Sequence, residues 1–204
     1  MSSPTQQKFD ELVKEVYWDT LKPLGFKKKA NNFYIFTGEI GKIINIQKSM
    51  YGTKDDIRFT INIGIFSPEI WLDLYNYQNK PVPVFPTEPD CIVRKRIGSL
   101  LKQGDIWYDL SDTSDLTALR DNQRRQLKEV ILPYFATINT NEDLIQMLDK
   151  EPSHTYNPIA RLILLAALIR TDAAKKVMEE LLNGNPSHNQ KIMIMEKAKA
   201  YGLL

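Results

Sequence analysis

The apolar residues near the start of the chain have the spacing of a helix that buries one face. Phe9, Leu12, Val13 and Val16 follow the i, i+3, i+4, i+7 rule, and charged residues fill most positions between them. A Pro-Leu-Gly run at 23–25 ends the pattern, because proline and glycine both interrupt helices. We therefore expect an N-terminal amphipathic helix.

From residue 26 to residue 66 the apolar residues recur at every second position, which is the period of a β-strand. Gly38-Glu39-Ile40-Gly41 has the composition of a turn between two such segments. Alternation returns in two shorter stretches further along the chain. The pattern predicts strands over 33–37, 42–50, 57–66, 91–97 and 106–110.

The second and third of these strands can be aligned with each other from their pattern alone. An antiparallel hairpin keeps its apolar residues on one face only if paired residue numbers have an odd sum, and a loop over 51–56 gives the sum 107. One face of the hairpin is then apolar, and the other carries a ladder of hydrogen-bonding side chains. The predicted pairs on that ladder are Asn45 with Asn62, Gln47 with Thr60, and Ser49 with Arg58.

The chain becomes helical after a proline-rich stretch. Residues 67–90 hold five prolines together with Trp71, Tyr75 and Tyr77, which predicts a short helix followed by an extended excursion. Beyond Asp112 the helical period returns and persists. Helix starts are expected at Asp112 or Ser114, at Thr140 with Asp143 as an acidic capping box, at Asn157-Pro158, at Thr171 and at Asn185-Pro186.

These elements predict an α+β fold in which an N-terminal helix packs on a mainly antiparallel sheet and an all-helical segment follows. We expect an α+β domain over residues 1–135 and a C-terminal helical segment over 136–204, packed on or beside it. Lys27-Lys28-Lys29 fits a solvated edge strand, since lysine on an edge opposes pairing with other chains.

The charge balance and the hydropathy of the chain limit the classes of partner that we expect. The 204 residues include 27 Lys and Arg against 25 Asp and Glu, and no basic stripe is present, which makes nucleic acid an unlikely partner. The longest apolar run, Leu162 to Ile169, is eight residues, too short to span a bilayer. The start of the chain does not have the pattern of a secretory signal. We therefore expect a cytoplasmic protein with no membrane partner.

Few residues could carry covalent chemistry. One cysteine and two histidines, His154 and His188, exclude a disulfide framework and any all-Cys/His zinc site. No nucleotide-binding or catalytic motif occurs, so no catalytic residue, metal site or cofactor is predicted. Cys91 reads as a buried small residue. The series Asp105, Asp109, Asp112 and Asp115 reads as helix capping.

The polar ladder is the candidate site. Arg94 and Arg96 would add guanidinium groups to its amides and hydroxyls if their strand lies next to it, and such a face could recognise a carboxylate or a phosphate. The alternative is that this is simply the wetted face of an antiparallel sheet. The candidate ligand-binding residues on the hairpin are Gln47, Ser49, Arg58, Thr60 and Asn62.

Several segments resemble a known family. They are Gly25-Phe26-Lys27-Lys28, Phe33-Tyr34, Asn45 to Ser49, Phe59 to Gly64, Arg96 to Leu100, and Trp107. Over about residues 8–130 the chain resembles the bacterial domain of unknown function 4304 family. The resemblance implies a helix with an antiparallel sheet and brings no activity with it. It adds Trp107 to the candidate site, because the shared pattern includes Gln47, Ser49, Asn62, Arg96 and Trp107.

Three functions are compatible with these residues. The first is a non-enzymatic binding module whose polar face, or whose aromatic excursion from Trp71 to Phe85, engages a protein. The second is a protein that binds or hydrolyses a small anionic ligand with Arg58, Arg96, Gln47 and Asn62, and with Asp109 as a base. The third, nucleic-acid binding, requires Tyr34, Phe36 or Phe66 on the open face. We favour the first, because amides, hydroxyls and arginines bind and orient more readily than they transfer protons.

Overall fold

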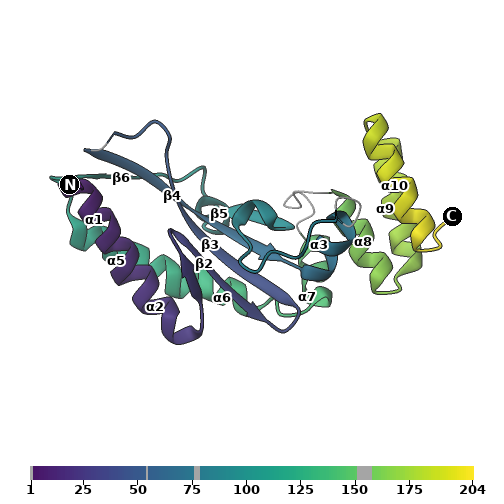
Figure 1. Cartoon of the computed structure of the whole chain (residues 1–204), viewed down its shortest axis with the longest axis horizontal. Helices are drawn as coiled ribbons and strands as arrows, with labels where there is room; N and C mark the ends of the chain where they lie inside the picture. Colours follow the sequence, from purple (N-terminus) through teal and green to yellow (C-terminus); the bar gives the residue numbers. More distant parts are fainter. Residues whose placement is uncertain (1, 54, 76–78, 151–157) are drawn as a thin grey trace.

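The protein is an α+β fold built around one antiparallel sheet, as the sequence predicts (Figure 1). The computed structural model describes residues 2–53, 55–75, 79–150 and 158–204. The strands follow the order β1-β2-β3-β4-β5. β6 also pairs with β4, along residues 56–59 of that strand, whereas β5 pairs with residues 62–65. Their bounds are β1 Lys27–Lys29, β2 Asn32–Thr37, β3 Ile40–Lys48, β4 Asp56–Phe66, β5 Val93–Arg96 and β6 Tyr108–Ser111.

The predicted register of the central hairpin is confirmed. Asn45 pairs with Asn62 and Gln47 with Thr60, and the Ser49 N–H donates to the carbonyl of Arg58 at 2.7 Å just beyond the ladder. The turn before β3 is tighter than expected, since Ile40 already belongs to the strand. β1 forms the exposed edge strand of three lysines.

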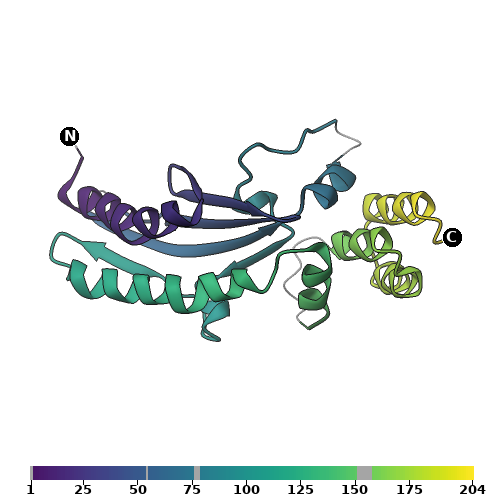
Figure 2. The ribbon, with the colours of Figure 1, turned by 90° about the horizontal axis from the view of Figure 1, so that it is seen from below.

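Two helical runs lie side by side and cover the apolar face of the sheet (Figures 1 and 2). The first runs through α1 Pro4–Leu12, the π-helical segment η1 Val13–Trp18, α2 Asp19–Leu21 and the 3-10 turn η2 Lys22–Leu24. The second runs through α5 Leu116–Gln126, the π-helical segment η5 Leu127–Ile131 and α6 Leu132–Ala136. Apolar residues on alternate positions of β3 and β4 are buried against these helices, which forms the main core.

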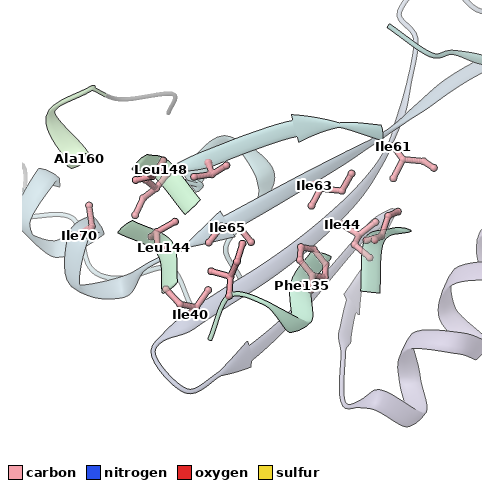
Figure 3. Packing of buried hydrophobic residues seen from close by; sticks show 14 of the residues in the cluster. Ile40, Ile44, Ile61, Ile63, Ile65, Ile70, Phe135, Leu144, Leu148 and Ala160 are labelled. Carbon is pink, nitrogen blue, oxygen red and sulfur yellow. The ribbon is translucent and has the colours of Figure 1, made fainter. Parts of the chain in front are cut away.

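The C-terminal helices extend the core beyond the end of the sheet. They are α7 Asn141–Lys150, α8 Pro158–Ala167, α9 Thr171–Asn183 and α10 His188–Ala200. The last three gather at the end of the molecule opposite the N-terminus (Figure 1). Figure 3 shows the labelled core residues of the sheet, Ile40, Ile44, Ile61, Ile63 and Ile65, with Phe135, Leu144 and Leu148 of α6 and α7 near them.

The carboxylate of Asp73 links α3, Pro68–Tyr75, to the C-terminal end of α10. Asp73 accepts a hydrogen bond from Tyr201 at 2.7 Å and forms an ion pair with Lys197 at 2.5 Å. Burial and the bond to Asp73 raise the pKa of Tyr201. Because one hydrophobic cluster runs from α1 to α10, the C-terminal helices belong to the same packed body as the sheet. The division at residue 135 stays a prediction.

Two of the predicted helix starts are wrong. Asp115, and not Asp112 or Ser114, caps α5, because the Ser114 hydroxyl instead accepts from the backbone N–H of Ser111. α10 begins after Ser187, whose side chain forms a capping box with Gln190, and not at Asn185-Pro186.

The starts at Thr140 and Thr171 are confirmed, and Asp143 completes the expected capping box. Asn157 and His154 lie outside the described residues. Two other short elements lie between the strands, the 3-10 turn η4 Glu88–Asp90 and α4 Ile97–Leu100. In the described part of the chain, none of the helices combines the length and the apolar character needed to cross a bilayer.

Candidate functional site

The face of the sheet opposite the main core, which we call the polar sheet face, is divided into a covered half and an open half. Residues of the proline-rich excursion and of α3 cover the first half. There Ile43, Phe66 and Cys91 form a second, small core, with Tyr34, Trp71 and Val82 packed against it. The covered half therefore serves the fold. Phe66 is buried and the half-buried Tyr34 packs on Phe85, whereas Phe36, on the same face, is 46% exposed.

The packing of Cys91 against β4 requires a glycine at position 64. A Cβ on Gly64 would lie 2.3 Å from Cys91 Sγ, so the cysteine occupies the space in which a side chain of β4 would stand. Burial raises the pKa of the Cys91 thiol well above its ordinary value. The sequence prediction that Cys91 is a buried small residue is confirmed.

An amide row crosses the sheet at the border of the two halves. Asn32, Asn45 and Asn62 occupy paired positions on β2, β3 and β4, and Arg96 of β5 continues the row. Asn45 Nδ2 donates to Asn32 Oδ1 at 2.8 Å, and Asn62 Nδ2 donates to both Asn45 Oδ1 at 3.1 Å and Gln47 Oε1 at 2.7 Å. Because Asn62 is only 4% exposed, the row ties three strands together from within.

Beside the amide row lies a group that we call the arginine–tryptophan cluster: Arg58, Arg96, Asp105, Trp107 and Asp109. The guanidinium carbons of Arg58 and Arg96 lie 5.6 and 5.2 Å from the ring centre of Trp107, within cation–π range. Arg96 donates to Asp105 at 2.5 Å, and the Trp107 indole N–H donates to the same carboxylate oxygen at 2.9 Å. Arg58 faces Asp109 at 3.6 Å. The cluster comes from β4, β5, β6 and the loop before β6.

The arginine–tryptophan cluster is close to neutral as a group. Hydrogen bonds from Arg96 and Trp107 lower the pKa of the Asp105 carboxyl, so it stays ionised opposite its arginine. The 3.6 Å contact between Arg58 and Asp109 joins two side chains that are 56% and 80% exposed. Each guanidinium therefore already has a carboxylate partner, and the Arg96 and Asp105 side chains are 40% and 50% exposed.

The remaining candidate residues are distributed over this face. Gln47 is exposed, and Ser49 is half-buried and accepts from the Tyr51 N–H at 3.1 Å. Thr60 is buried and donates to the carbonyl of Ile106 at 2.8 Å, which fixes the loop that carries Trp107. The guanidinium of Arg94 does not contact the ladder residues, because it binds the carboxylate of Glu88 in the 3-10 turn η4.

The loop between β3 and β4 adds a feature that the sequence analysis did not single out. Met50 and Tyr51 are 92% and 95% exposed. Next to them a hollow of about 440 Å³, the tip hollow, is lined by Tyr51, Gly52, Thr53, Asp56, Ile57, Arg58, Asp109, Leu110, Ser111 and Ser114. Arg58 and Asp109 thus belong both to the hollow and to the arginine–tryptophan cluster. The strand predicted over 42–50 ends at Lys48 in the structure, which leaves Met50 in the loop beside Tyr51, and the aromatic Tyr51 inside the predicted loop 51–56 is the signal that could have revealed this feature.

The acidic series behaves differently from its prediction. Only Asp115 caps a helix, whereas Asp105 and Asp109 are the partners of the two arginines. Asp109 is thus an exposed ion-pair partner in this structure. Among the described residues, no three His, Cys, Asp or Glu side chains lie together in a way that could hold a metal ion.

The model of the family described as "Domain of unknown function (DUF4304)" matches residues 18–137. The chain belongs to the DUF4304 family. No curated protein and no solved structure matches the chain. The DUF4304 match starts later and ends later than the resemblance over 8–130, and it includes every residue of the polar sheet face.

Proposed function

We propose that this DUF4304 protein is a non-enzymatic binding module of the bacterial cytoplasm and that the open half of its polar sheet face engages a protein partner. The observation that carries the proposal is the arginine–tryptophan cluster, in which the guanidinium groups of Arg58 and Arg96 both lie within cation–π range of the half-buried Trp107. Tryptophan and arginine are the residue types most enriched among the energetic centres of protein interfaces.

The cluster is ordered before any partner arrives. Asp105 binds both Arg96 and Trp107, and the loop beneath them is held by Thr60. A pre-ordered surface loses less side-chain entropy on association, so more of the contact energy appears as affinity. Gln47 supplies an exposed amide at the edge of the same surface.

A small anionic ligand is the second candidate. The observation that favours it is the long Arg58–Asp109 contact of 3.6 Å beside the tip hollow, because an anion could replace that carboxylate. Two features weigh against it. Arg96 is bound to Asp105, and the Asn62 amide nitrogen already donates to two oxygens.

The test uses a photo-crosslinking amino acid, p-benzoyl-phenylalanine, placed at Gln47 in the full-length protein in its native cells. The matched control places it at Lys175, an exposed residue of α9 far from the sheet face. We expect a discrete protein crosslink from position 47 that is absent from position 175. Trp107→Ala, checked by circular dichroism for folding, should remove that crosslink and weaken binding of the identified, purified partner at least about tenfold.

Two outcomes would contradict the proposal. In the first, positions 47 and 175 give the same crosslinks or none. In the second, binding to the purified partner is unchanged by Trp107→Ala. If instead phosphate or a small carboxylate raises the melting temperature of the wild type, and Arg58→Ala abolishes that rise, the anionic-ligand function is supported in its place.

A further inference from the structure

We propose that the free edge of β1 binds an extended acidic segment of another protein, which adds to the sheet as a further strand. This surface is separate from the arginine–tryptophan cluster, because β1 lies at the opposite edge of the sheet from β5 and β6. Three observations carry the inference: the free edge, four lysines without ionic partners, and a hollow beside the strand.

The backbone of β1 offers hydrogen-bonding groups to a further strand. On one side β1 pairs with β2, where residues 27–29 oppose residues 32–34. In the described part of the chain, no strand pairs with its other side. Because alternate residues of an antiparallel strand turn their N–H and C=O groups away from the partner strand, part of the backbone of β1 is directed at this free side. An extended chain that pairs there would satisfy these groups.

The edge strand is fixed in position before any partner arrives. Phe26, directly before it, is 6% exposed, and its N–H donates to the carbonyl of Leu21 at 3.2 Å. On β2, Phe33 is fully buried, and its ring stacks on that of Tyr17 with the ring centres 6.0 Å apart. A strand held in this way loses little conformational entropy on binding, so more of the contact energy appears as affinity.

The charge near this edge is positive and uncompensated. Four exposed lysines lie on β1 or shortly before it: Lys22, Lys27, Lys28 and Lys29. The sequence has no acidic residue between Asp19 and Glu39. Among the residues that the structure describes, none forms an ion pair with any of these four lysines. Their ammonium groups are therefore available to carboxylates of a partner.

The lysines of β1 are presented on both faces of the sheet. Lys27 and Lys29 share the polar sheet face with Asn32 of the amide row. Lys28 points to the core side, where its ammonium group lies 5.8 Å from the ring centre of Phe33. A strand added at this edge would place each of its three facing residues opposite a lysine. Opposite charges in such cross-strand pairs are stabilising, which favours three successive acidic residues.

A hollow beside Lys28 leaves room for the incoming side chains. Its volume is about 500 Å³. Its described lining is Asp10, Val13, Trp18, Lys28, Ala30 and Asn31. Asp10, the acidic residue of this lining, accepts a hydrogen bond from the Gln6 side chain at 2.7 Å. The ammonium group of Lys22 lies 5.8 Å from the ring centre of Trp18, and that ring lies 6.5 Å from the ring of Phe33. Lys22 and Lys28 thus belong to one surface.

Charge complementarity selects the occupant of the edge. Two copies of this protein that met through β1 would bring lysines opposite lysines, and like charges in cross-strand pairs are destabilising. A nucleic acid would contact the ammonium groups, but it has no peptide backbone with which to pair the free edge. An extended acidic segment satisfies both the main-chain groups and the lysines.

The test measures the fluorescence anisotropy of a fluorescein-labelled peptide, Thr-Val-Glu-Glu-Glu-Val-Thr, titrated with the full-length protein. Two variants of the peptide separate main-chain pairing from charge. One carries N-methyl groups on the backbone nitrogens of the glutamates, and the other has lysine in place of each glutamate. We expect both to bind at least about tenfold more weakly than the parent peptide. A labelled oligothymidine with three phosphates measures simple attraction of an anion and should also bind more weakly.

Lys28→Glu is the protein variant, and Lys175→Glu in α9 is its matched control, because both lysines are exposed and both changes reverse one charge. Lys28→Glu should weaken binding of the parent peptide at least about fivefold, since it places like charges opposite each other. Lys175→Glu should change it less than about twofold, because a distant exposed charge is screened. Circular dichroism and thermal melts check that both variants are folded. Hydrogen exchange of the amides of β1 should slow when the parent peptide binds.

Four outcomes would overturn the inference. They are no measurable binding of the parent peptide, unchanged binding after N-methylation, oligothymidine binding as tight as that of the parent peptide, and equal effects of Lys28→Glu and Lys175→Glu. The second and third would show attraction of anions to lysines without strand pairing. None of these outcomes bears on the crosslinking test from position 47, because that position lies on β3 and reports on the other surface.

Discussion

The two faces of β4 show how one strand can serve two purposes. On one face Ile57, Phe59, Ile61, Ile63 and Ile65 are all buried in the main core. On the other face the sequence Arg58, Thr60, Asn62, Gly64 passes from exposed to covered within four positions. The apolar face is uniform because it meets only helices. The polar face changes along its length because a loop, an excursion and solvent each cover a different part of it.

This contrast implies very different costs for substitutions on neighbouring residues. Ile61→Ala should lower the free energy of unfolding by about 2–5 kcal/mol, because it opens a cavity in a fully buried site. Arg58→Ala, on the open part of the other face, should change it by less than about 1 kcal/mol. Urea denaturation of both variants measures the difference. Equal losses would mean that the two faces contribute alike to stability.

A second comparison separates the buried and open parts of the polar sheet face. Asn62→Ala should cost about 1–3 kcal/mol, since it removes the donor to Asn45 and Gln47 inside the sheet. Gln47→Ala is the matched variant at the exposed end of the same hydrogen bond and should cost about 0.5 kcal/mol, because water replaces the lost partner. Equal losses of unfolding free energy in the two variants would mean that the buried Asn62 does not link the strands more strongly than the exposed Gln47 does.

The smallest expected effect concerns pH. The pKa of Asp105 is lowered in the folded protein, so its bonds to Arg96 and Trp107 add stability above the unfolded pKa of about 3.9 and lose it as pH falls through the folded value. Asp105→Asn should therefore reduce the loss of stability on acidification below about pH 4. Acid titrations followed by circular dichroism compare the two proteins. An identical acid dependence would show that Asp105 adds nothing measurable.

The sequence predicted the sheet well where the pattern itself contains the geometry. Alternation required an odd sum for paired residues, because a shift of one residue would turn the apolar side chains outward. Together with a loop over 51–56, this constraint paired Asn45 with Asn62 and Gln47 with Thr60. Helix starts were harder. Several capping residues stand together near 112–115, and the choice among them depends on which hydroxyl the preceding strand uses.

The composition of the candidate site was only partly predictable. The strand pattern would add Arg96 to the ladder only if its strand lay next to the hairpin, and the structure supplies that pairing with Asn62. The pattern could not show that Asp105 would return to bind Arg96, because the loop between them has no period. The sequence also did not reveal that the proline-rich excursion and α3 cover one half of the polar sheet face. This cover depends on the close approach of Cys91 to Gly64, which comes from the path of the excursion and not from any local propensity.

The attachment of α10 to Asp73 shows that the end of the family match and the end of the packed core are two different boundaries. The DUF4304 match ends at residue 137 and includes Asp73, but both partners of that carboxylate lie far beyond it. A chain cut after residue 137 would also remove α7, whose Leu144 and Leu148 belong to the same core as the isoleucines of β3 and β4 (Figure 3). Sequence similarity thus stops where packing continues. In this protein, the boundary of the family match is therefore not a boundary of the hydrophobic core.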